Sequence, residues 1–243
     1  MVDLLSSDLC RFSYRDWLSH FTRNDQERLK IDFSEEKELS AQARALIFPS
    51  IRAFQKGEGS DGRFLRTAVS SFCKKHDLPD YEKAMDLFIR EENWHSSYLK
   101  QYMAYHKIAE LPHSFLDRVF RRLRRLGGLR CEVIVLVTAE MIALTYYSAL
   151  ERCTDSKALK SICGQMLQDE VPHAIFQSYT LSRFRNGFPA RLFRWLLMEF
   201  TCLGVWSAFH KVYQKGGYTF SGFFKENQGY LRQSILLAEK NEK

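Results

Sequence analysis

The sequence predicts an all-α protein: a four-helix bundle with additional helices toward its N- and C-terminal ends. Hydrophobic residues make up 45% of the 243 residues, with 5 prolines and 12 glycines, a composition that suits helices. Neither strand-like alternation of apolar and polar residues nor alternation of strands with helices stands out. In addition, polar residues of metal-binding type interrupt the apolar stripes of three predicted helices.

The length permits one large or two small domains. We expect a single helical domain over residues 1–243, with a metal-binding bundle core over about 35–180 and a C-terminal helical extension over about 188–243. The six cysteines are scattered without a Cys-x-x-Cys motif, which indicates free thiols in a reducing compartment. The first residues lack a basic stretch followed by an apolar core, so we expect no signal peptide and a cytoplasmic protein.

The N-terminal half is predicted to contain a short helical arm over residues 1–33, with Ser13 as an N-cap. A long helix from about 34 to 56 follows, with a kink at Pro49, and the glycine-rich segment 57–62 ends it. We then expect a helix over 63–75. The next one has Asp80 as its N-cap and runs to about residue 106.

The C-terminal half begins with a basic segment, 112–126, predicted to be a short crossover helix whose five arginines form a solvated face. Phosphate or an anionic membrane surface is the alternative contact for these arginines. After two helices joined near 153–156, residues 192–213 are predicted to pack as an added helix. It holds Arg194 and Glu199, so we expect that it does not span a bilayer. A final helix starts at about Ser221.

One charged residue, Glu140, lies within the apolar stretch Val133–Leu150. A carboxylate in such surroundings is costly unless it is protonated, paired or bound to a metal. If a metal ion binds Glu140, other predicted helices must supply further ligands.

Two Glu-x-x-His motifs supply them: Glu92 with His95, and Glu170 with His173. Residues three apart share one face of a helix, so each motif can direct a carboxylate and an imidazole to the same point. A third match, Glu110-x-x-His113, contains a proline. The residue before a proline is pushed out of the helical region, so we interpret this match as a loop coincidence.

The spacing of Glu140 and Glu170 also indicates a shared metal site. Glu140 lies 15 residues before Asp155 and Glu170 lies 15 residues after it, so an antiparallel hairpin would bring the two glutamates to one level. Two Glu-x-x-His motifs, with a lone glutamate from each of two other helices, make the dinuclear carboxylate site of a four-helix bundle. The alternative is two unrelated charges, one of them buried and paired with an arginine.

The second lone glutamate is predicted to be Glu58, because Gly57 and Gly59 would let the backbone approach closely. Simple hairpin arithmetic leaves it about 9 Å out of level with Glu92, a gap that the glycine-rich break could close by folding back. The alternative is an ordinary loop residue. The remaining candidates are grouped at the start of the first long helix: Glu35, Glu36 and Glu38.

This ligand set resembles that of the ferritin-like non-haem diiron carboxylate proteins: Glu58, Glu92, His95, Glu140, Glu170 and His173. The resemblance implies two iron ions that activate dioxygen to oxidise a substrate, with Glu140 and Glu170 as the catalytic carboxylates; manganese suits the same ligands. The segments GEGSDGRF and FIREENWH are similar to small biosynthetic diiron enzymes, including nitrile-forming enzymes that act on halogenated tryptophan.

Four aromatic residues near the ligands are candidates to line a substrate pocket: Phe54, Phe88, Tyr147 and Phe176. The alternative is that they fill the core. We expect a small aromatic substrate, dioxygen and an external electron donor as partners. We expect no nucleic acid, because no recognition motif accompanies the net charge of +7. Stable membrane insertion is not expected, and the oligomeric state is a monomer or homodimer.

Three other classes stay open at this level. An iron-storage protein would use the same ligands but needs a multimeric shell. A haem-oxygenase-like diiron oxidase would also be helical but would place its ligands differently. An interaction module with a degenerate site would bind no metal.

Overall fold

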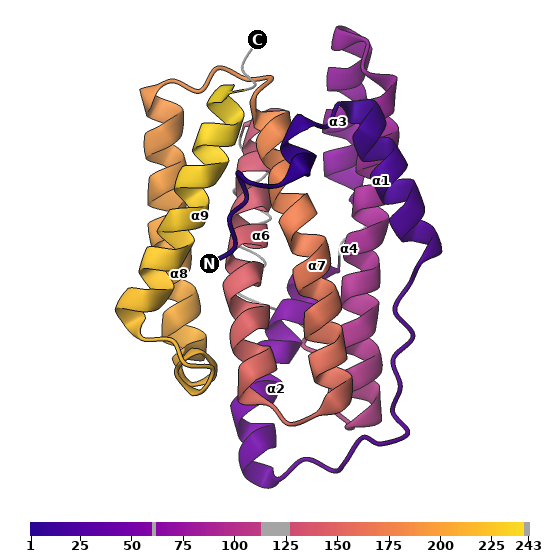
Figure 1. Ribbon diagram of the computed structural model, residues 1–243, viewed down its shortest axis with the longest axis vertical. Helices are drawn as coiled ribbons and strands as arrows, with labels where there is room; N and C mark the ends of the chain where they lie inside the picture. Colours follow the sequence, from indigo (N-terminus) through magenta and orange to yellow (C-terminus); the bar gives the residue numbers. More distant parts are fainter. Residues whose placement is uncertain (60–61, 113–126, 241–243) are drawn as a thin grey trace. The chain divides into compact units, whose positions relative to one another are not determined.

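The computed structural model describes residues 1–59, 62–112 and 127–240 (Figure 1). Over these ranges the regular structure is helical and no strand is present, which confirms the all-α prediction. The predicted basic crossover helix, over residues 112–126, lies almost entirely outside the described residues. So does His113 of the third Glu-x-x-His motif.

The chain divides into two compact units. The small unit comprises Arg11–Lys30 and Arg52–Glu132. The large unit comprises Met1–Cys10, Ile31–Ile51 and Val133–Lys243. The boundary between the units falls inside one helix, α2 (Ala41–Glu58), whose first eleven residues belong to the large unit. The expected single domain stays a prediction.

The small unit contains α1 (Tyr14–Gln26), α3 (Arg63–His76) and α4 (Pro79–Tyr105), and both α1 and α3 pack on α4. Ser13 caps α1 as predicted, in a reciprocal capping box with Asp16.

α4 begins differently from the prediction. Its N-cap is Leu78 and Pro79 is its first residue, so the assignment of Asp80 as N-cap is wrong. Proline suits the first helical position because it needs no hydrogen bond there and its φ is already helical. Asp80 lies instead in the first turn, where its negative charge interacts favourably with the helix dipole.

α2 starts and ends later than predicted. It starts at Ala41 because Ser40 caps it: the Ser40 hydroxyl accepts a hydrogen bond from the Ala43 N–H at 3.2 Å. It continues to Glu58, so this glutamate is the last residue of a helix and not part of a glycine-rich loop. As a candidate ligand, Glu58 is therefore held at the end of a helix.

The large unit contains α6 (Gly128–Cys153, from Val133 onward), α7 (Lys157–Leu181), α8 (Phe188–Lys215) and α9 (Phe220–Lys240). α6 and α7 run side by side in opposite directions (Figure 1). The three-residue turn between them ends with Ser156, the N-cap of α7. α9 packs on α7 and α8, and Asn227 of α9 hydrogen-bonds Thr145 of α6 at 3.2 Å.

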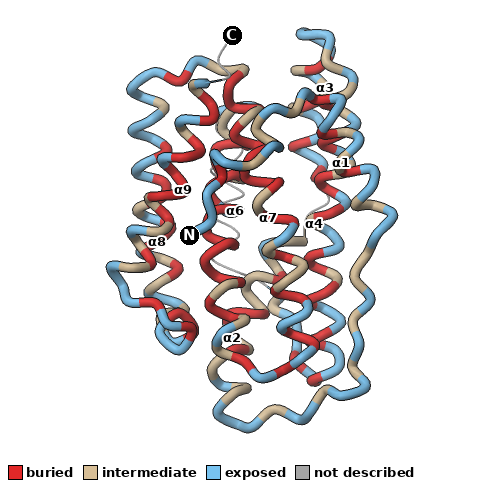
Figure 2. The backbone as a smooth tube through the Cα atoms, in the orientation of Figure 1, coloured by how far each residue is buried: buried red, intermediate tan, exposed pale blue. Residues whose placement is uncertain are grey.

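The two most apolar helices differ in burial (Figure 2). By length and composition α6 and α8 could each cross a membrane, but the most apolar window of α6 is 83% buried and that of α8 is 33% buried. Arg194 and Glu199 therefore do not make α8 too polar to span by composition. The expectation that α8 does not span a bilayer stays a prediction. The burial of α6 is that of a core helix, whereas α8 leaves an apolar surface exposed.

Candidate metal centre

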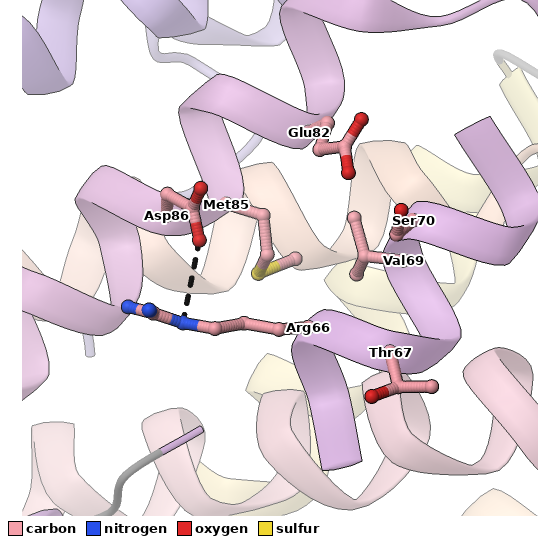
Figure 3. Close-up of a pocket in the computed structure, with 7 residues that line it drawn as sticks. All are labelled: Arg66, Thr67, Val69, Ser70, Glu82, Met85 and Asp86. Carbon is pink, nitrogen blue, oxygen red and sulfur yellow. Dashed lines mark ion pairs between the residues drawn. The ribbon is translucent and has the colours of Figure 1, made fainter. Parts of the chain in front are cut away.

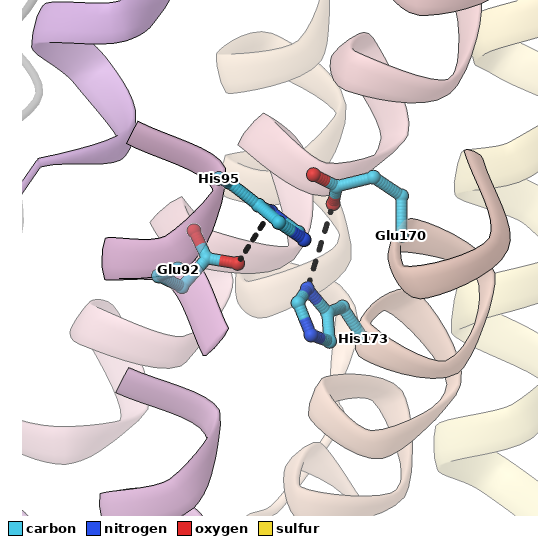
Figure 4. Close-up of side chains that lie close together, drawn as sticks. All are labelled: Glu92, His95, Glu170 and His173. Atoms are coloured by element: carbon cyan, nitrogen blue, oxygen red, sulfur yellow. Dashed lines mark ion pairs between the residues drawn. The ribbon is translucent and has the colours of Figure 1, made fainter. Parts of the chain in front are cut away.

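The α4 motif offers two candidate metal ligands. His95 is fully buried and the side chain of Glu92 is 15% exposed. Their closest atoms, His95 Nδ1 and Glu92 Oε1, are 3.6 Å apart (Figure 4). This distance is too long for a hydrogen bond. It suits two ligands of one ion, because two atoms each about 2.1 Å from a metal can be up to about 4.2 Å apart.

The neighbouring glutamate, Glu91, has a different role. It is buried and pairs with Arg28 Nη1 at 3.4 Å, and the Arg28 guanidinium also lies over the ring of Trp94, 5.4 Å from its centroid. Arg28 in turn pairs with Asp25 of α1. Of these two adjacent acids, Glu91 therefore forms a structural ion pair and Glu92 is the candidate ligand. The Glu-x-x-His spacing selects Glu92, but the sequence holds no local signal for the partner of Glu91.

The end of α2 is fixed beside the α4 motif. The Gln55 side chain donates to Ser96 Oγ, and Ser96 Oγ donates to the Gln55 carbonyl, both at 3.0 Å. A Cβ added at Gly59 would lie 2.9 Å from Ser96 Oγ, so glycine permits this approach. These contacts hold the last turn of α2, which carries Glu58, next to the residue that follows His95.

The α7 motif offers two more candidate ligands. Glu170 and His173 are both fully buried, and Glu170 Oε2 lies 3.7 Å from His173 Nδ1 (Figure 4). Pro172 lies between them without ending α7. The preceding acid, Asp169, accepts hydrogen bonds from the Gln165 side chain at 3.0 Å. As on α4, one acid of the pair has a polar partner, here on its own helix, and the next lies beside the histidine.

Glu140 is 3% exposed on α6, within the same unit as the α7 motif. It lies thirteen residues before the end of α6, and Glu170 lies thirteen residues after the start of α7, so the predicted equal spacing from the turn holds. The fallback candidates lie near that turn instead. Glu35 pairs with Lys157, and Glu36 accepts a hydrogen bond from the Ala158 N–H, about 18 Å along α7 from Glu170.

Among the residues that the structure describes, each motif offers one carboxylate and one imidazole, and these make up the group of candidate metal ligands: Glu92, His95, Glu170 and His173 (Figure 4). Glu58 and Glu140 are not members of that group. Their place in the ligand set stays a prediction.

The proposed pocket residues are largely core residues by burial. Phe88, Tyr147 and Phe176 are buried, and Phe54 is half-buried. The ring of Phe88 lies 6.3 Å from that of Phe21, and the ring of Tyr147 lies 5.0 Å from that of Tyr146. Such edge-to-face contacts are those of packed aromatic residues. Their role in substrate binding stays a prediction.

One polar residue near the α7 motif was not among the predicted site residues. Gln177 is fully buried, and neither polar atom of its carboxamide has a hydrogen-bond partner within the described ranges. It follows His173 by four residues and Glu170 by seven, so the three share one face of α7. This spacing could have identified Gln177 from the sequence.

Two surface pockets lie away from these motifs. One, of about 310 Å³, lies between α3 and α4 and is crossed by an ion pair of 3.3 Å between Arg66 Nε and Asp86 Oδ1 (Figure 3). The other, of about 360 Å³, lies beside the turn between α6 and α7. Neither contains a residue of the two Glu-x-x-His motifs.

Comparisons with known proteins agree with this architecture. No family model and no curated protein matches the sequence. Among solved structures, the chain resembles an R2-like ligand-binding oxidase with an aerobically reconstituted Mn/Fe cofactor, with a TM-score of 0.65 and 14% identity over 96% of this chain and 93% of that one. A point mutant of such an oxidase, reconstituted anaerobically, gives 0.65 and 13% over 96% and 94%. The fold is ferritin-like. At this level of identity, the likeness concerns the fold alone.

Proposed function

We propose that this protein is an oxidoreductase that binds two transition-metal ions and uses dioxygen to oxidise a small organic substrate. The observation that carries the proposal is the pair of Glu-x-x-His motifs, each with a buried histidine beside its carboxylate, in a ferritin-like fold. Iron is the expected metal. Manganese suits the same nitrogen and oxygen ligands, and the solved structures that share the fold contain Mn/Fe cofactors.

The donor set supports this assignment. Each motif offers one imidazole and one carboxylate at a separation that a single ion could bridge. Burial of an ionised carboxylate such as Glu170 is unfavourable unless a positive charge lies close to it. A bound cation would supply that charge, and neutral imidazole completes the ligand set.

In the proposed centre, Glu92 and His95 would hold one ion and Glu170 and His173 would hold the other. Glu140 and Glu58 would supply the remaining carboxylate ligands. Glu140 and Glu170 would be the catalytic carboxylates, because they would touch both the metal and the reacting groups. The bound ions supply electron transfer to dioxygen, which protein side chains alone do not provide.

The residues of this chain would then control access and orientation. Burial of His95 and His173 keeps bulk water from their imidazoles. The hydrogen bonds between Gln55 and Ser96 fix the end of α2 beside His95, and a ligand held by such supporting bonds keeps its orientation. Gln177, one turn beyond His173, could hydrogen-bond a polar group of the substrate.

The proposed substrate is a small aromatic molecule such as an amino acid. This class is supported by the aromatic residues one or two turns from the ligands, among them Phe88 and Tyr147. Halogenated tryptophan, with a nitrile as its product, is one specific candidate suggested by the sequence resemblance. A basic residue would hold the substrate carboxylate.

Anaerobic titration of the metal-free protein with Fe(II) tests the proposal. We expect two ions per chain. On exposure to oxygen we expect an optical change and oxygen uptake that an aromatic amino acid stimulates. The metal-free protein should consume no oxygen, and re-addition of Fe(II) should restore the uptake. Oxygen-dependent turnover in the metal-free protein would contradict the proposal.

A matched pair of variants makes the test specific. Glu92→Gln should lower the bound metal to one ion per chain or fewer. Glu91→Gln should leave the stoichiometry at two, because the amide still accepts the hydrogen bond from Arg28. Equal metal loss in both variants would show that general destabilisation, and not ligation, explains the effect.

A further inference from the structure

Much of α8 is exposed (Figure 2), and many of its exposed side chains are apolar. Over its first four turns, seven large apolar side chains are between 36% and 75% exposed: Phe188, Leu192, Phe193, Trp195, Leu196, Phe200 and Leu203. We call this set the α8 face. Most of its members recur every three or four residues, so they lie along one side of the helix for about 22 Å. The opposite side, with Met198 and Cys202, is buried.

The area of the α8 face exceeds what an isolated chain usually exposes. If a large apolar side chain offers about 200 Å² when fully exposed, the seven fractions amount to roughly 700 Å². The largest apolar patch of a typical monomer is about 300–600 Å². A stable protein–protein interface covers about 800 Å² on each partner. The α8 face therefore has the size of one half of such an interface.

The charges beside the α8 face disfavour a lipid surface as its occupant. Of the two arginines between Phe188 and Leu203, Arg194 is buried against Ser234 Oγ at 2.6 Å. Arg191 is 53% exposed at its side chain and pairs with Glu239 at 2.7 Å. The ionisable residue that lies three or four positions from Trp195, Leu196 and Leu203, and so among the exposed apolar residues, is an acid, Glu199, which accepts a hydrogen bond from Gln228. Interfacial membrane helices instead present lysine and arginine to anionic lipid.

We propose that the α8 face is the interface of a homodimer, in which it packs against the same face of a second copy of this chain. A two-fold interface brings one patch against itself, and an apolar face whose neighbouring arginine, Arg191, is already paired with Glu239 is complementary to such a copy. With the two α8 helices antiparallel, Phe188 of each copy lies toward Leu203 of the other, and Trp195 and Leu196 lie near the axis. This inference does not depend on the proposed metal chemistry.

Light scattering coupled to size-exclusion chromatography tests the interface on the full chain after Fe(II) loading. At tens of micromolar protein we expect a mass of about 57 kDa, twice the 28.6 kDa of one chain. Phe200→Glu and Leu203→Glu should each shift the mass to that of a monomer, because the new charge would be buried at the interface. Both variants should keep the helical circular dichroism of the parent.

A matched control is Leu5→Glu, since Leu5 is 41% exposed and Leu203 is 46% exposed; it should remain dimeric. A monomeric parent at 100 µM would overturn the proposal, and so would glutamate variants that stay dimeric. Co-sedimentation with vesicles of equal parts phosphatidylcholine and phosphatidylserine covers the lipid alternative. A monomeric parent that binds these vesicles, and loses the binding in Phe200→Glu, would assign the face to a membrane.

Discussion

Neighbouring residues of the same type have different surroundings on α4. Glu91 pairs with Arg28, whereas Glu92 lies beside His95. On α7, Asp169 is bonded to Gln165, whereas Glu170 lies beside His173. A helix places consecutive residues about 100° apart around its axis, so one of two adjacent acids can face a partner that the other cannot reach. The chemistry of each acid follows from its position on the helix and not from its type.

Two of the Glu-x-x-His motifs should respond differently when their histidine is replaced by alanine. His173→Ala should remove at least one bound iron per chain, because a buried imidazole next to Glu170 is lost. His113→Ala should leave the iron content unchanged, since Pro112 makes its motif incompatible with a regular helix. Iron per chain, measured after gel filtration, compares them. Equal iron loss would show that the motif string alone, and not its helical context, selects the site.

Glu140→Ala should abolish tight binding of at least one metal ion while the helices remain formed. The carboxylate is buried in the apolar stretch of α6, and alanine favours a helix. Metal stoichiometry and far-ultraviolet circular dichroism measure the two effects separately. An unchanged stoichiometry would mean that Glu140 is not a ligand.

Gln177→Met should raise the thermal stability of the metal-free protein. The buried carboxamide has no hydrogen-bond partner among the described residues, and an unsatisfied buried polar group costs about 1–3 kcal/mol. Methionine has a similar shape without that cost. We expect an increase of up to about 2 kcal/mol in the free energy of unfolding. A loss of stability would show that Gln177 makes a favourable interaction in the folded chain.

At the scale of helices, the contact between α2 and α4 decides where Glu58 lies. Hairpin arithmetic places Glu58 away from the level of Glu92, but the hydrogen bonds between Gln55 and Ser96 bring the end of α2 beside the α4 motif. The position of Glu58 depends on these side-chain contacts. α2 and α4 are not consecutive helices of a simple hairpin, because α3 lies between them in the chain. A count of residues therefore does not determine the level.

Two neighbouring glycines test this contact. Gly59→Ala should destabilise the protein by about 1–3 kcal/mol, as overpacking does, and should weaken metal binding, because its Cβ would meet Ser96 Oγ. Gly57→Ala is the control: nothing lies within 4 Å of a Cβ there, and alanine should stabilise α2 by up to about 1 kcal/mol. Chemical denaturation and Fe(II) titration measure both. If both alanines stabilise, the close approach at Ser96 is not a constraint.

For the molecule as a whole, the C-terminal helices are part of the large unit and not an appendage. α9 packs on α7, Asn227 bonds Thr145 of α6, and a Cβ at Gly216 would lie 2.4 Å from the Ala149 carbonyl oxygen. The N-terminal residues also belong here, since the Leu4 N–H donates to Gln233 of α9. The helix that carries Glu170 and His173 thus depends on contacts from both ends of the sequence.

Deletion of residues 188–243 should therefore prevent stable folding. The deletion removes the helices that cover α6 and α7 and exposes their apolar surface. Burial of such surface stabilises the folded protein by about 25 cal/mol per Å². We expect an aggregated or largely unfolded product, checked by circular dichroism and light scattering. A soluble, helical fragment that still binds two metal ions would show that the extension is dispensable.

The sequence by itself determines the local part of this protein. Helix geometry relates residues three and four apart directly, so the pairing of Glu92 with His95 and of Glu170 with His173, and the burial of Glu140, follow from spacing and hydrophobic periodicity. The equal distances of Glu140 and Glu170 from their turn are also readable, because the connection between α6 and α7 is short.

Tertiary structure alone decides the rest. The partner of Glu91, the tie between Gln55 and Ser96 and the exposure of Phe200 each depend on segments far apart in the chain. Such contacts form only when the packing of whole helices outweighs the entropy of closing long loops, and that balance depends on side-chain shapes across both segments. Residue spacing within one helix carries no information about it.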